Sequence, residues 1–374
     1  MRNRKRLQGI LRIVSFILCI PLIYVMSAVT LPYVKPFFEN AAAISAGLSF
    51  LEGGKSAMKQ DFIIDDNLQV NNDTESVPYD EYVPPQSQSS SSQTESASSS
   101  STTSSDMPNN TGKILKQTYK AGTTALYIPL NNGYIKNCTK LSIDTIKKAV
   151  EQKPKFKIKA DKKPEVLIMH THTTESFESE SRDWFYKGST SRTTDNTKNM
   201  VRIGDEIEKQ LTAAGIGVIH DKTLHDYPSY NGAYERSAVT VKRILKENPS
   251  IKVVLDVHRD AIQPDENTMI APVTTINGKS CAQVMIISGC DNGKMGMPNY
   301  MENLKFSASL QRQMEKDYPT LARPILFDYR KYNQNLTTGS ILLEMGGHAN
   351  SLDEAIYCGQ LVGDSLAKTL ASLK

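Results

Sequence analysis

Residues 166–172 read Val-Leu-Ile-Met-His-Thr-His, four apolar residues followed at once by His-Thr-His. A short continuous apolar run is typical of a strand that is buried on both faces of a sheet. Four apolar residues at helix spacing come next along the chain: Met200, Ile203, Ile207 and Leu211. Gly215 follows them, as glycine often does at the end of a helix. This part of the sequence therefore predicts a buried strand and then an amphipathic helix.

The same alternation continues to the C-terminus. Further buried strands are predicted at residues 217–219, 253–257, 283–288 and 341–343. Helices are predicted around residues 234–245 and 306–314, and a last helix begins after Ser351, which forms a capping box with Glu354. Strands that alternate with helices of this length predict an α/β fold, a three-layer sandwich around a largely parallel sheet.

Ionisable residues directly follow three of these apolar runs. His170 and His172 follow the first strand, and His258 and Glu344 each follow a later one. In open α/β sheets, functional groups gather outside the carboxyl ends of the strands. A charge in such a place is unfavourable unless it is paired or bound to a metal. Two imidazoles and a carboxylate at one edge match a catalytic zinc site, which uses three nitrogen or oxygen ligands and leaves a fourth position for water.

The histidines have a second interpretation. His170 and His172 both lie beyond the apolar run, so we expect only one of them to bind metal and the other to orient a ligand or contact substrate. His258 alone would more often be a structural histidine. Its placement together with His172 and Glu344 favours a metal ligand instead.

Two acidic residues are candidates for the carboxylate ligand. Asp195 stands just before the predicted helix, where the alternative role is that of an N-cap. Glu175 follows the histidine pair closely and is either a ligand or a hydrogen-bond acceptor within a loop. His220, His225 and His348 have less specific settings and are interpreted as structural.

Four motifs, in order along the chain, resemble a known family. They read Val-Leu-Ile-Met-His-Thr-His-Thr-Thr-Glu-Ser-Phe at 166–177, Arg-Thr-Thr-Asp-Asn-Thr-Lys-Asn-Met at 192–200, Leu-Asp-Val-His-Arg-Asp-Ala at 255–261 and Leu-Leu-Glu-Met-Gly-Gly-His-Ala-Asn-Ser at 342–351. Over residues 113–374 the chain closely resembles the stage II sporulation protein P family. That family consists of membrane-anchored cell-wall hydrolases of endospore-forming bacteria, distantly similar to zinc-dependent N-acetylmuramoyl-L-alanine amidases. The resemblance implies an amidase-like fold and peptidoglycan as substrate.

The resemblance also implies roles for individual residues. The zinc ligands fall on His172, Asp195 and His258, and the catalytic glutamate falls on Glu344. The amidases have a glutamate where this chain has Asp195, so Glu175 remains the alternative acidic ligand. The implied reaction is hydrolysis of the N-acetylmuramoyl-L-alanine amide by zinc-activated water, with Glu344 as general base and acid. Endopeptidase cleavage of stem-peptide cross-links is implied as a second activity, and the stage II sporulation proteins D and M are implied as partners at the engulfing septum.

Two other functions fit parts of the sequence. A non-catalytic peptidoglycan-binding scaffold would keep the membrane segment and treat the histidines as relics. A metallocarboxypeptidase would trim the free ends of stem peptides. Arg259 lies beside a predicted ligand and either pairs with substrate carboxylates or forms a structural ion pair.

The N-terminal segment predicts a membrane anchor. Residues 13–34 contain no charge over 22 positions, and a helix needs about 20 apolar residues to cross a bilayer. Five basic residues precede this span, so the positive-inside rule places the N-terminus in the cytoplasm and the rest of the chain outside the cell membrane. A cleaved signal peptide is the alternative, but the apolar run is longer than the roughly 7–15 residues of such a signal.

The chain divides into four predicted parts. Residues 1–35 form the cytoplasmic stub and transmembrane helix. Residues 36–112 form an acidic tether, in which 12 of the 20 residues at 86–105 are serine, so it buries too little apolar surface to fold. Residues 113–160 form an extension of the catalytic domain, which itself occupies residues 161–374.

The charge balance excludes one class of partner. The net charge is +4, but six basic residues precede the first acidic residue, Glu39, and the remainder has 38 basic and 40 acidic residues. A nucleic-acid-binding domain would need basic charge clustered on one face, so nucleic acid is not expected as a partner.

The five cysteines show no CxxC spacing, so free thiols are expected, with a Cys281–Cys290 disulfide as the alternative.

Overall fold

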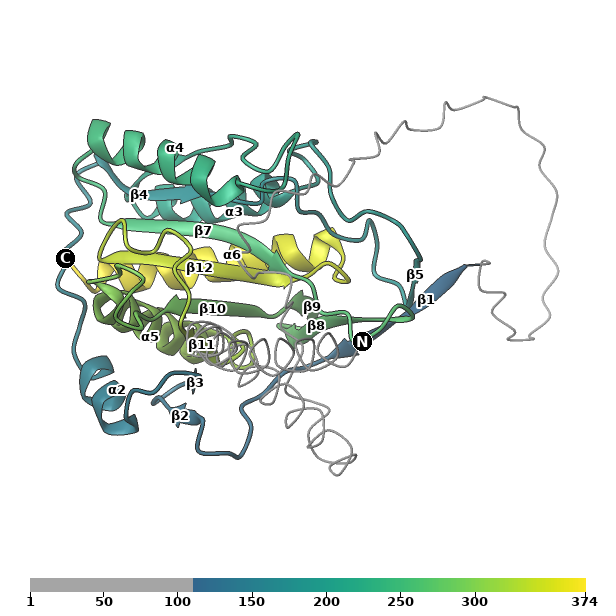
Figure 1. The fold of residues 1–374 in the computed structure, drawn as a ribbon, viewed down its shortest axis with the longest axis horizontal. Coiled ribbons are helices and arrows are strands. Elements are labelled where there is room, and N and C mark those ends of the chain that lie inside the picture. The colour runs from purple at the N-terminus through teal and green to yellow at the C-terminus, as the bar shows by residue number, and fades with distance from the viewer. Residues whose placement is uncertain (1–109) are drawn as a thin grey trace, which may run out of the picture. The chain divides into compact units, whose positions relative to one another are not determined.

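The computed structural model describes residues 110–374 (Figure 1). The predicted cytoplasmic stub, the predicted membrane span and all but the end of the predicted tether lie outside these residues. Within residues 110–374, no helix combines the length and the apolar character that crossing a bilayer requires.

An eight-stranded sheet forms the centre of the fold. Its strands lie in the order β2 (Tyr127–Pro129), β3 (Tyr134–Asn137), β11 (Ile325–Asp328), β10 (Val284–Gly289), β12 (Gly339–Gly347), β7 (Val253–Asp260), β4 (Pro164–Met169) and β6 (Gly217–His220). The apolar runs that predicted strands form the middle of this sheet, where every residue of β7, β10 and β12 is buried. Strands buried on both faces need such continuous apolar sequences.

The sheet is mixed, whereas the sequence predicts a largely parallel one. In the described part of the chain, five of its pairings are parallel, and the pairings β10–β12 and β2–β3 are antiparallel. The reason lies in the connection from β11 to β12, residues 329–338, which contains no helix. Parallel strands are usually joined by a crossover helix, and a chain without one returns in the opposite direction. Because β11 runs parallel to β10, β12 therefore runs antiparallel to β10.

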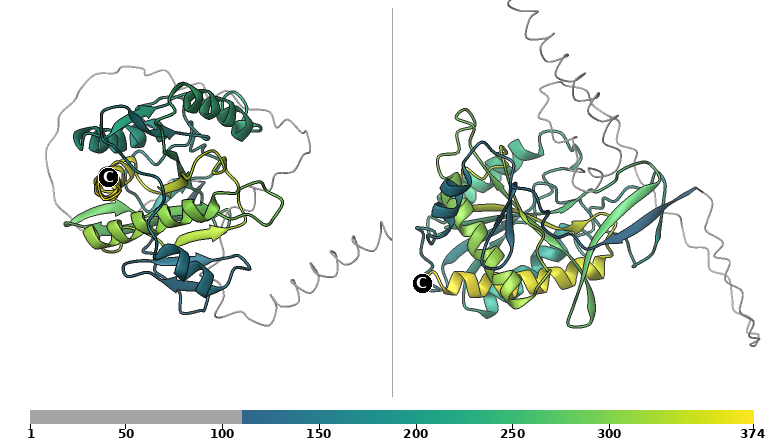
Figure 2. Two further views of the ribbon diagram at one scale, coloured as in Figure 1. Left: turned by 90° about the vertical axis from the view of Figure 1, so that its left-hand side faces the viewer. Right: turned by 90° about the horizontal axis from the view of Figure 1, so that it is seen from below.

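Helices cover both faces of the sheet (Figures 1 and 2). The helix α4 (Ala233–Glu247) packs on one face through Val241 and Ile244. The other face carries α3 (Met200–Ala213), α5 (Tyr300–Asp317) and α6 (Leu352–Ala371), which share the largest apolar core with the sheet. The helix α6 begins with the predicted capping box, in which Ser351 and Glu354 bond each other's backbone N–H groups. The predicted α/β class is confirmed, whereas the sheet at its centre is mixed.

A second, smaller sheet was not predicted. Its strands lie in the order β5 (Trp184–Tyr186), β1 (Thr111–Gln117), β8 (Thr268–Ile276) and β9 (Lys279–Ala282). The turn from β8 to β9 is Asn277-Gly278, with φ of +50° and +77°. Asn-Gly is the strongest short hairpin signal, because both turn residues must adopt positive φ. Figure 1 shows this sheet beyond the carboxyl end of β7.

Residues 113–160 contribute to both sheets and add one helix. Strand β1 pairs with β8 in the small sheet, and β3 pairs with β11 at the edge of the large one. The helix α2 (Ile143–Val150) begins after Ser142, whose side chain accepts a hydrogen bond from the Thr145 N–H. Its buried residues Ile146 and Val150 belong to the main core.

The described cysteines are free thiols, as expected. Burial raises the pKa of the Cys358 thiol, with Cys281 as its neighbour. The alternative Cys281–Cys290 disulfide is not formed.

Candidate active site

A small cavity of about 70 Å³ lies where β4, β7 and β12 end. This volume admits a few water molecules. Its lining comprises His172, Glu175, Arg192, Tyr230, Tyr234, His258, Arg259, Asp260, Ala261, Tyr332, Leu342 and Glu344. Five of the residues singled out in the sequence therefore share one cavity: His172, Glu175, His258, Arg259 and Glu344.

The strand register explains this convergence. In the parallel pairing of β7 with β12, His258 and Glu344 are direct partners, and β4 places Met169 opposite Asp256. Side chains alternate along a strand, so Asp256 and His258 point to the same face as Val254, the face covered by α4. The cavity therefore lies between the sheet and α4.

His172 is buried and has no hydrogen-bond partner among the described residues at either ring nitrogen. Its ring stacks on Tyr230 with the centroids 4.4 Å apart, and the edges of Tyr234 and His258 pack against it. Burial lowers the pKa of His172 to about 3. The imidazole is thus neutral at pH 7, the form that binds metal.

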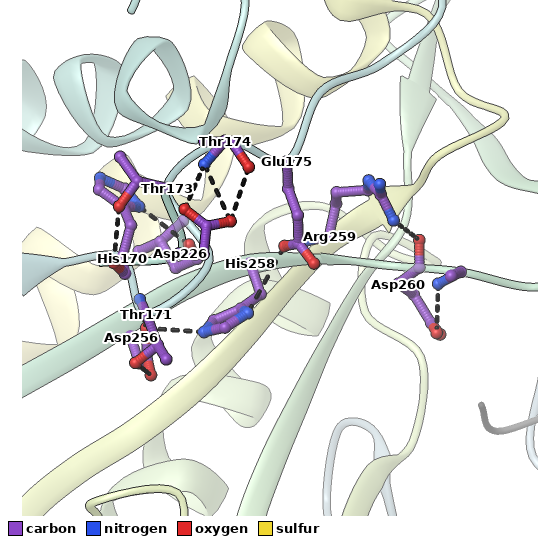
Figure 3. A network of polar contacts seen from close by, with 12 residues as sticks. His170, Thr171, Thr173, Thr174, Glu175, Asp226, Asp256, His258, Arg259 and Asp260 are labelled. Atoms are coloured by element: carbon purple, nitrogen blue, oxygen red, sulfur yellow. Dashed lines mark hydrogen bonds and ion pairs between the residues drawn. The ribbon is translucent and has the colours of Figure 1, made fainter. Parts of the chain in front are cut away.

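His258 lies between two carboxylates (Figure 3). Its Nε2 is 2.7 Å from Asp256 Oδ1, and its Nδ1 is 3.5 Å from Glu175 Oε2. Burial by itself lowers the pKa of His258, but the two carboxylates outweigh it and raise that pKa well above the usual value. Asp256 also accepts hydrogen bonds from the Thr171 N–H and hydroxyl, which fix its position beside the ring.

Glu175 is the acidic residue of the cavity. Burial acts to raise its pKa, but the Arg259 guanidinium and His258 lower it well below the usual range. Its Oε2 accepts a hydrogen bond from the Arg259 N–H, and Arg192 lies 3.5 Å from Oε1. Glu175 is therefore an ionised carboxylate next to both histidines.

Asp195 does not line the cavity. It lies in the exposed loop before α3, where Oδ1 accepts hydrogen bonds from the N–H and hydroxyl of Thr197 and Oδ2 is 3.1 Å from Lys198. The Thr197 hydrogen bonds are the main reason that its pKa is lowered to about 2. The helix N-cap is Asn199, whose side chain accepts a hydrogen bond from the Val201 N–H.

Glu344 faces the cavity with an Oε2 that has no hydrogen-bond partner among the described residues. Burial and the neighbouring Asp260 carboxylate raise its pKa to about 8, despite the opposing effect of His258. A carboxyl group with this pKa can take up and release a proton near neutral pH.

His170 does not line the cavity, although it stands two residues from His172. Its Nδ1 is 2.9 Å from the Val257 carbonyl oxygen, and its Nε2 is 2.9 Å from His220 Nε2. The geometry thus separates the two histidines of the motif: His172 faces the cavity and His170 the neighbouring strands.

The cavity offers donors for a metal: a neutral imidazole with unpartnered nitrogens, a second imidazole from which a metal would displace a proton, and an ionised carboxylate. These are the ligand types that zinc takes in hydrolases. Within residues 110–374, however, the one group whose donor atoms all lie within 4.8 Å of one another is Asp205, Glu208 and His220, outside the cavity. The cavity donors are more widely spaced.

Comparison with known proteins identifies the family. Residues 50–367 match the family model for stage II sporulation protein P. The chain belongs to this family. It is 32% identical over 219 residues to the stage II sporulation protein P of Bacillus subtilis (strain 168), an alignment that covers 54% of this chain and 50% of that protein. The chain thus matches about half the length of this relative.

Solved structures give a weaker likeness. The N-acetylmuramoyl-L-alanine amidase AmiC2 of Nostoc punctiforme is 10% identical, with a TM-score of 0.32, covering 56% of this chain and 96% of that one. The CwlD amidase from Clostridioides difficile, solved in complex with the GerS lipoprotein, is 11% identical with a TM-score of 0.35, covering 56% and 99%.

Three tyrosines that line the cavity, Tyr230, Tyr234 and Tyr332, were not predicted as site residues from the sequence. Tyr234 falls within the helix predicted around residues 234–245, and Tyr230 and Tyr332 belong to no motif that indicates a site. Tyr332 has a positive φ of +42°, which no sequence pattern indicates. The sequence leaves Arg259 either to pair with substrate carboxylates or to form a structural ion pair. In the structure its guanidinium donates to the backbone carbonyls of Ser176, Ser191 and Asp260. The structure assigns Arg259 to the wall of the site.

Proposed function

We propose that the chain is a sporulation peptidoglycan hydrolase that cleaves the N-acetylmuramoyl-L-alanine amide. The observation that carries this proposal is the cavity in which His172, Glu175, His258 and Glu344 meet. Membership of the stage II sporulation protein P family supports the peptidoglycan substrate. Cleavage of stem-peptide cross-links is proposed as a second activity of the same chain.

His172, His258 and Glu175 would bind a zinc ion, with Glu175 in place of the predicted Asp195. Glu175 contacts His258 inside the cavity, whereas Asp195 pairs with Lys198 on the surface. When bound, zinc would supply Lewis acidity to a water molecule and to the scissile carbonyl. Asp256 would orient His258 through the ion pair of its Oδ1 with Nε2 at 2.7 Å, and hydrogen bonds from Thr171 hold the Asp256 carboxylate in place.

Glu344 would act as general base and then general acid. Its unpartnered Oε2 would accept a proton from the attacking water and return it to the leaving amine. The raised pKa of Glu344 favours the second step, because the protonated form persists near neutral pH.

The arginines of the site argue against a carboxypeptidase. Such an enzyme binds the terminal carboxylate of its substrate, which calls for an available cation. Arg259 is committed to backbone carbonyls, and Arg192 pairs with Asp226 at 2.7 Å. An internal amide is therefore the better substrate for this cavity.

The location and partners are part of the proposal. The uncharged span at 13–34 and the serine-rich segment after it would anchor the enzyme to the cell membrane, with its catalytic part outside. Family resemblance suggests stage II sporulation proteins D and M as partners at the septum. The residues beyond the first 35 have a net charge of −2, so they provide no general electrostatic attraction to an anionic wall. Tethering near the septal wall would instead raise the local concentration of the enzyme at its substrate.

The test is muropeptide release by the purified full-length chain with added zinc. His172→Ala and His258→Ala should abolish release and lower zinc content, while Glu247→Gln, a surface change on α4, should not. Wild-type release by both histidine variants would refute the mechanism. Wall binding without release by the wild-type protein would support the scaffold instead, and free D-alanine as the product would indicate a carboxypeptidase.

A further inference from the structure

A second group of metal-ligand side chains lies between α3 and β6. Asp205 and Glu208 are on α3, and His220 is the last residue of β6. His220 Nδ1 is 3.2 Å from Asp205 Oδ1 and 3.2 Å from Glu208 Oε2. The imidazole is buried, with 1% of its side chain exposed, while the carboxylates are about one-third exposed at 38% and 36%. Solvent can therefore enter from the carboxylate side only.

Hydrogen bonds outside this group determine which nitrogen of His220 carries the proton. The Val257 carbonyl oxygen can only accept, so His170 Nδ1 must donate to it. A neutral His170 then presents a lone pair at Nε2, 2.9 Å from His220 Nε2, and His220 must donate there. This assignment from hydrogen-bond partners leaves His220 Nδ1 without a proton.

The unprotonated Nδ1 consequently faces two carboxylates. A lone pair opposite two anionic oxygens at 3.2 Å is repulsive unless a cation lies between them. Lys222 does not fill this role, because its Nζ pairs with Asp205 Oδ1 at 2.7 Å but has no ion pair with Glu208 among the described residues, and its side chain is 44% exposed. The remaining occupants are a metal ion or an extra proton shared by the two imidazoles.

We propose that Asp205, Glu208 and His220 form a second divalent metal site, separate from the cavity and independent of the proposed hydrolase mechanism. With metal bonds of about 2.1 Å, neighbouring ligand atoms lie roughly 3.0–3.4 Å apart, which matches both measured separations. One imidazole and two carboxylates suit zinc or a similar first-row ion, and water completes the coordination on the exposed side.

Gly204 lies directly against the imidazole rings of His170 and His220. A methyl group at this position of α3 would lie 2.5 Å from His220 Nε2 and 2.9 Å from His170 Nε2. Glycine therefore allows the helix to approach both rings. The metal would link α3 to β6, and through His170 it would support the end of β4, two residues before His172.

The test measures zinc bound by the purified full-length chain after saturation with zinc alone and removal of the excess. The double variant Asp205→Asn/Glu208→Gln keeps the side-chain shapes and removes the charges. It should lose one zinc equivalent relative to wild type. His220→Gln, whose amide can still bond His170, should lose the same equivalent. Glu247→Gln serves as the control.

The outcomes separate this site from the cavity. If His172→Ala and the double variant each lose one equivalent, both sites exist. If only the double variant loses zinc, the second site stands and the zinc mechanism proposed for the cavity fails. Unchanged zinc content in a double variant whose circular dichroism matches wild type would overturn the second site and assign the cation as a proton. Should the double variant not fold, His220→Gln decides in the same way.

Discussion

The two groups of metal-ligand side chains differ in spacing and in burial. In the cavity, His172, Glu175 and His258 are buried and spaced apart, and they come from a loop and a strand. Between α3 and β6, the donor atoms lie within 4.8 Å of one another, and the carboxylates contact solvent. A site that performs chemistry needs a group beside its ligands that can transfer protons, and the cavity has Glu344 in its lining. This neighbour suggests a catalytic role for the first group, whereas the placement of the second group between two elements suggests a structural role.

Glu344→Gln gives the largest expected effect. Loss of the proton-transfer group should reduce muropeptide release by about 10²–10⁴-fold, and zinc content at both groups should stay at the wild-type level. The matched variant is Asp205→Asn/Glu208→Gln, which should retain release within about tenfold of wild type because it acts only on structure. Equal losses in the two variants would break the distinction between a catalytic and a structural group.

Glu175→Gln against Asp195→Asn decides the acidic ligand. Glu175 contacts His258, so replacing its carboxylate with the glutamine amide should weaken zinc binding. Muropeptide release should fall by about tenfold or more. Asp195 bonds Thr197 and Lys198 on the surface, so its variant should behave as wild type. Zinc titration and muropeptide release measure both. The reverse ranking would restore the ligand implied by family resemblance.

The sequence predicted the cavity better than the second group, and the reason is geometric. His258 and Glu344 each follow an apolar run, and parallel register makes such residues neighbours. Asp205 and Glu208 read as the polar face of a helix, and nothing in the sequence shows that this helix packs against the end of β6. His220 was accordingly interpreted as structural.

The acidic ligand marks another limit of the sequence. Asp195 and Glu175 both stand in the right motifs, and only the folding of the loops shows which carboxylate turns inward. The small sheet was missed for a different reason: the Asn277-Gly278 turn is a local signal that could have been used. The antiparallel placement of β12 depends on the path of the connection at 329–338, which apolar periodicity does not encode.

The pH dependence of stability offers a third way to probe the cavity. In the metal-free protein, the pKa of Glu344 is about 8, against 4.5 for an exposed glutamate. Between these values the folded state retains a proton that the unfolded state releases, so this group's contribution to stability is complete below pH 4.5 and is lost as the pH rises through 8. The Glu344→Gln variant has no carboxyl group at this position, so its stability should not show this loss as the pH rises.

Thermal unfolding in the presence of a chelator measures the difference. The melting temperature of Glu344→Gln relative to wild type should rise between pH 5 and pH 8. Asp205→Asn/Glu208→Gln should show no such trend relative to wild type, because it leaves Glu344 unchanged. A difference between Glu344→Gln and wild type that is independent of pH would mean that Glu344 is not held in a desolvated position.

Gly204→Ala is expected to give the smallest effect, and its sign is informative. Alanine is favoured over glycine within helices by about 1 kcal/mol, so on propensity alone the variant should be more stable. The added methyl group would lie 2.5 Å from His220 Nε2, and such overpacking typically costs about 1–3 kcal/mol. Denaturant unfolding should thus show net destabilisation, and zinc should be lost at Asp205, Glu208 and His220 but not in the cavity. A stabilised variant with full zinc content would show that α3 can shift without disturbing the imidazole pair, and the proposed link between α3 and β6 would then fail.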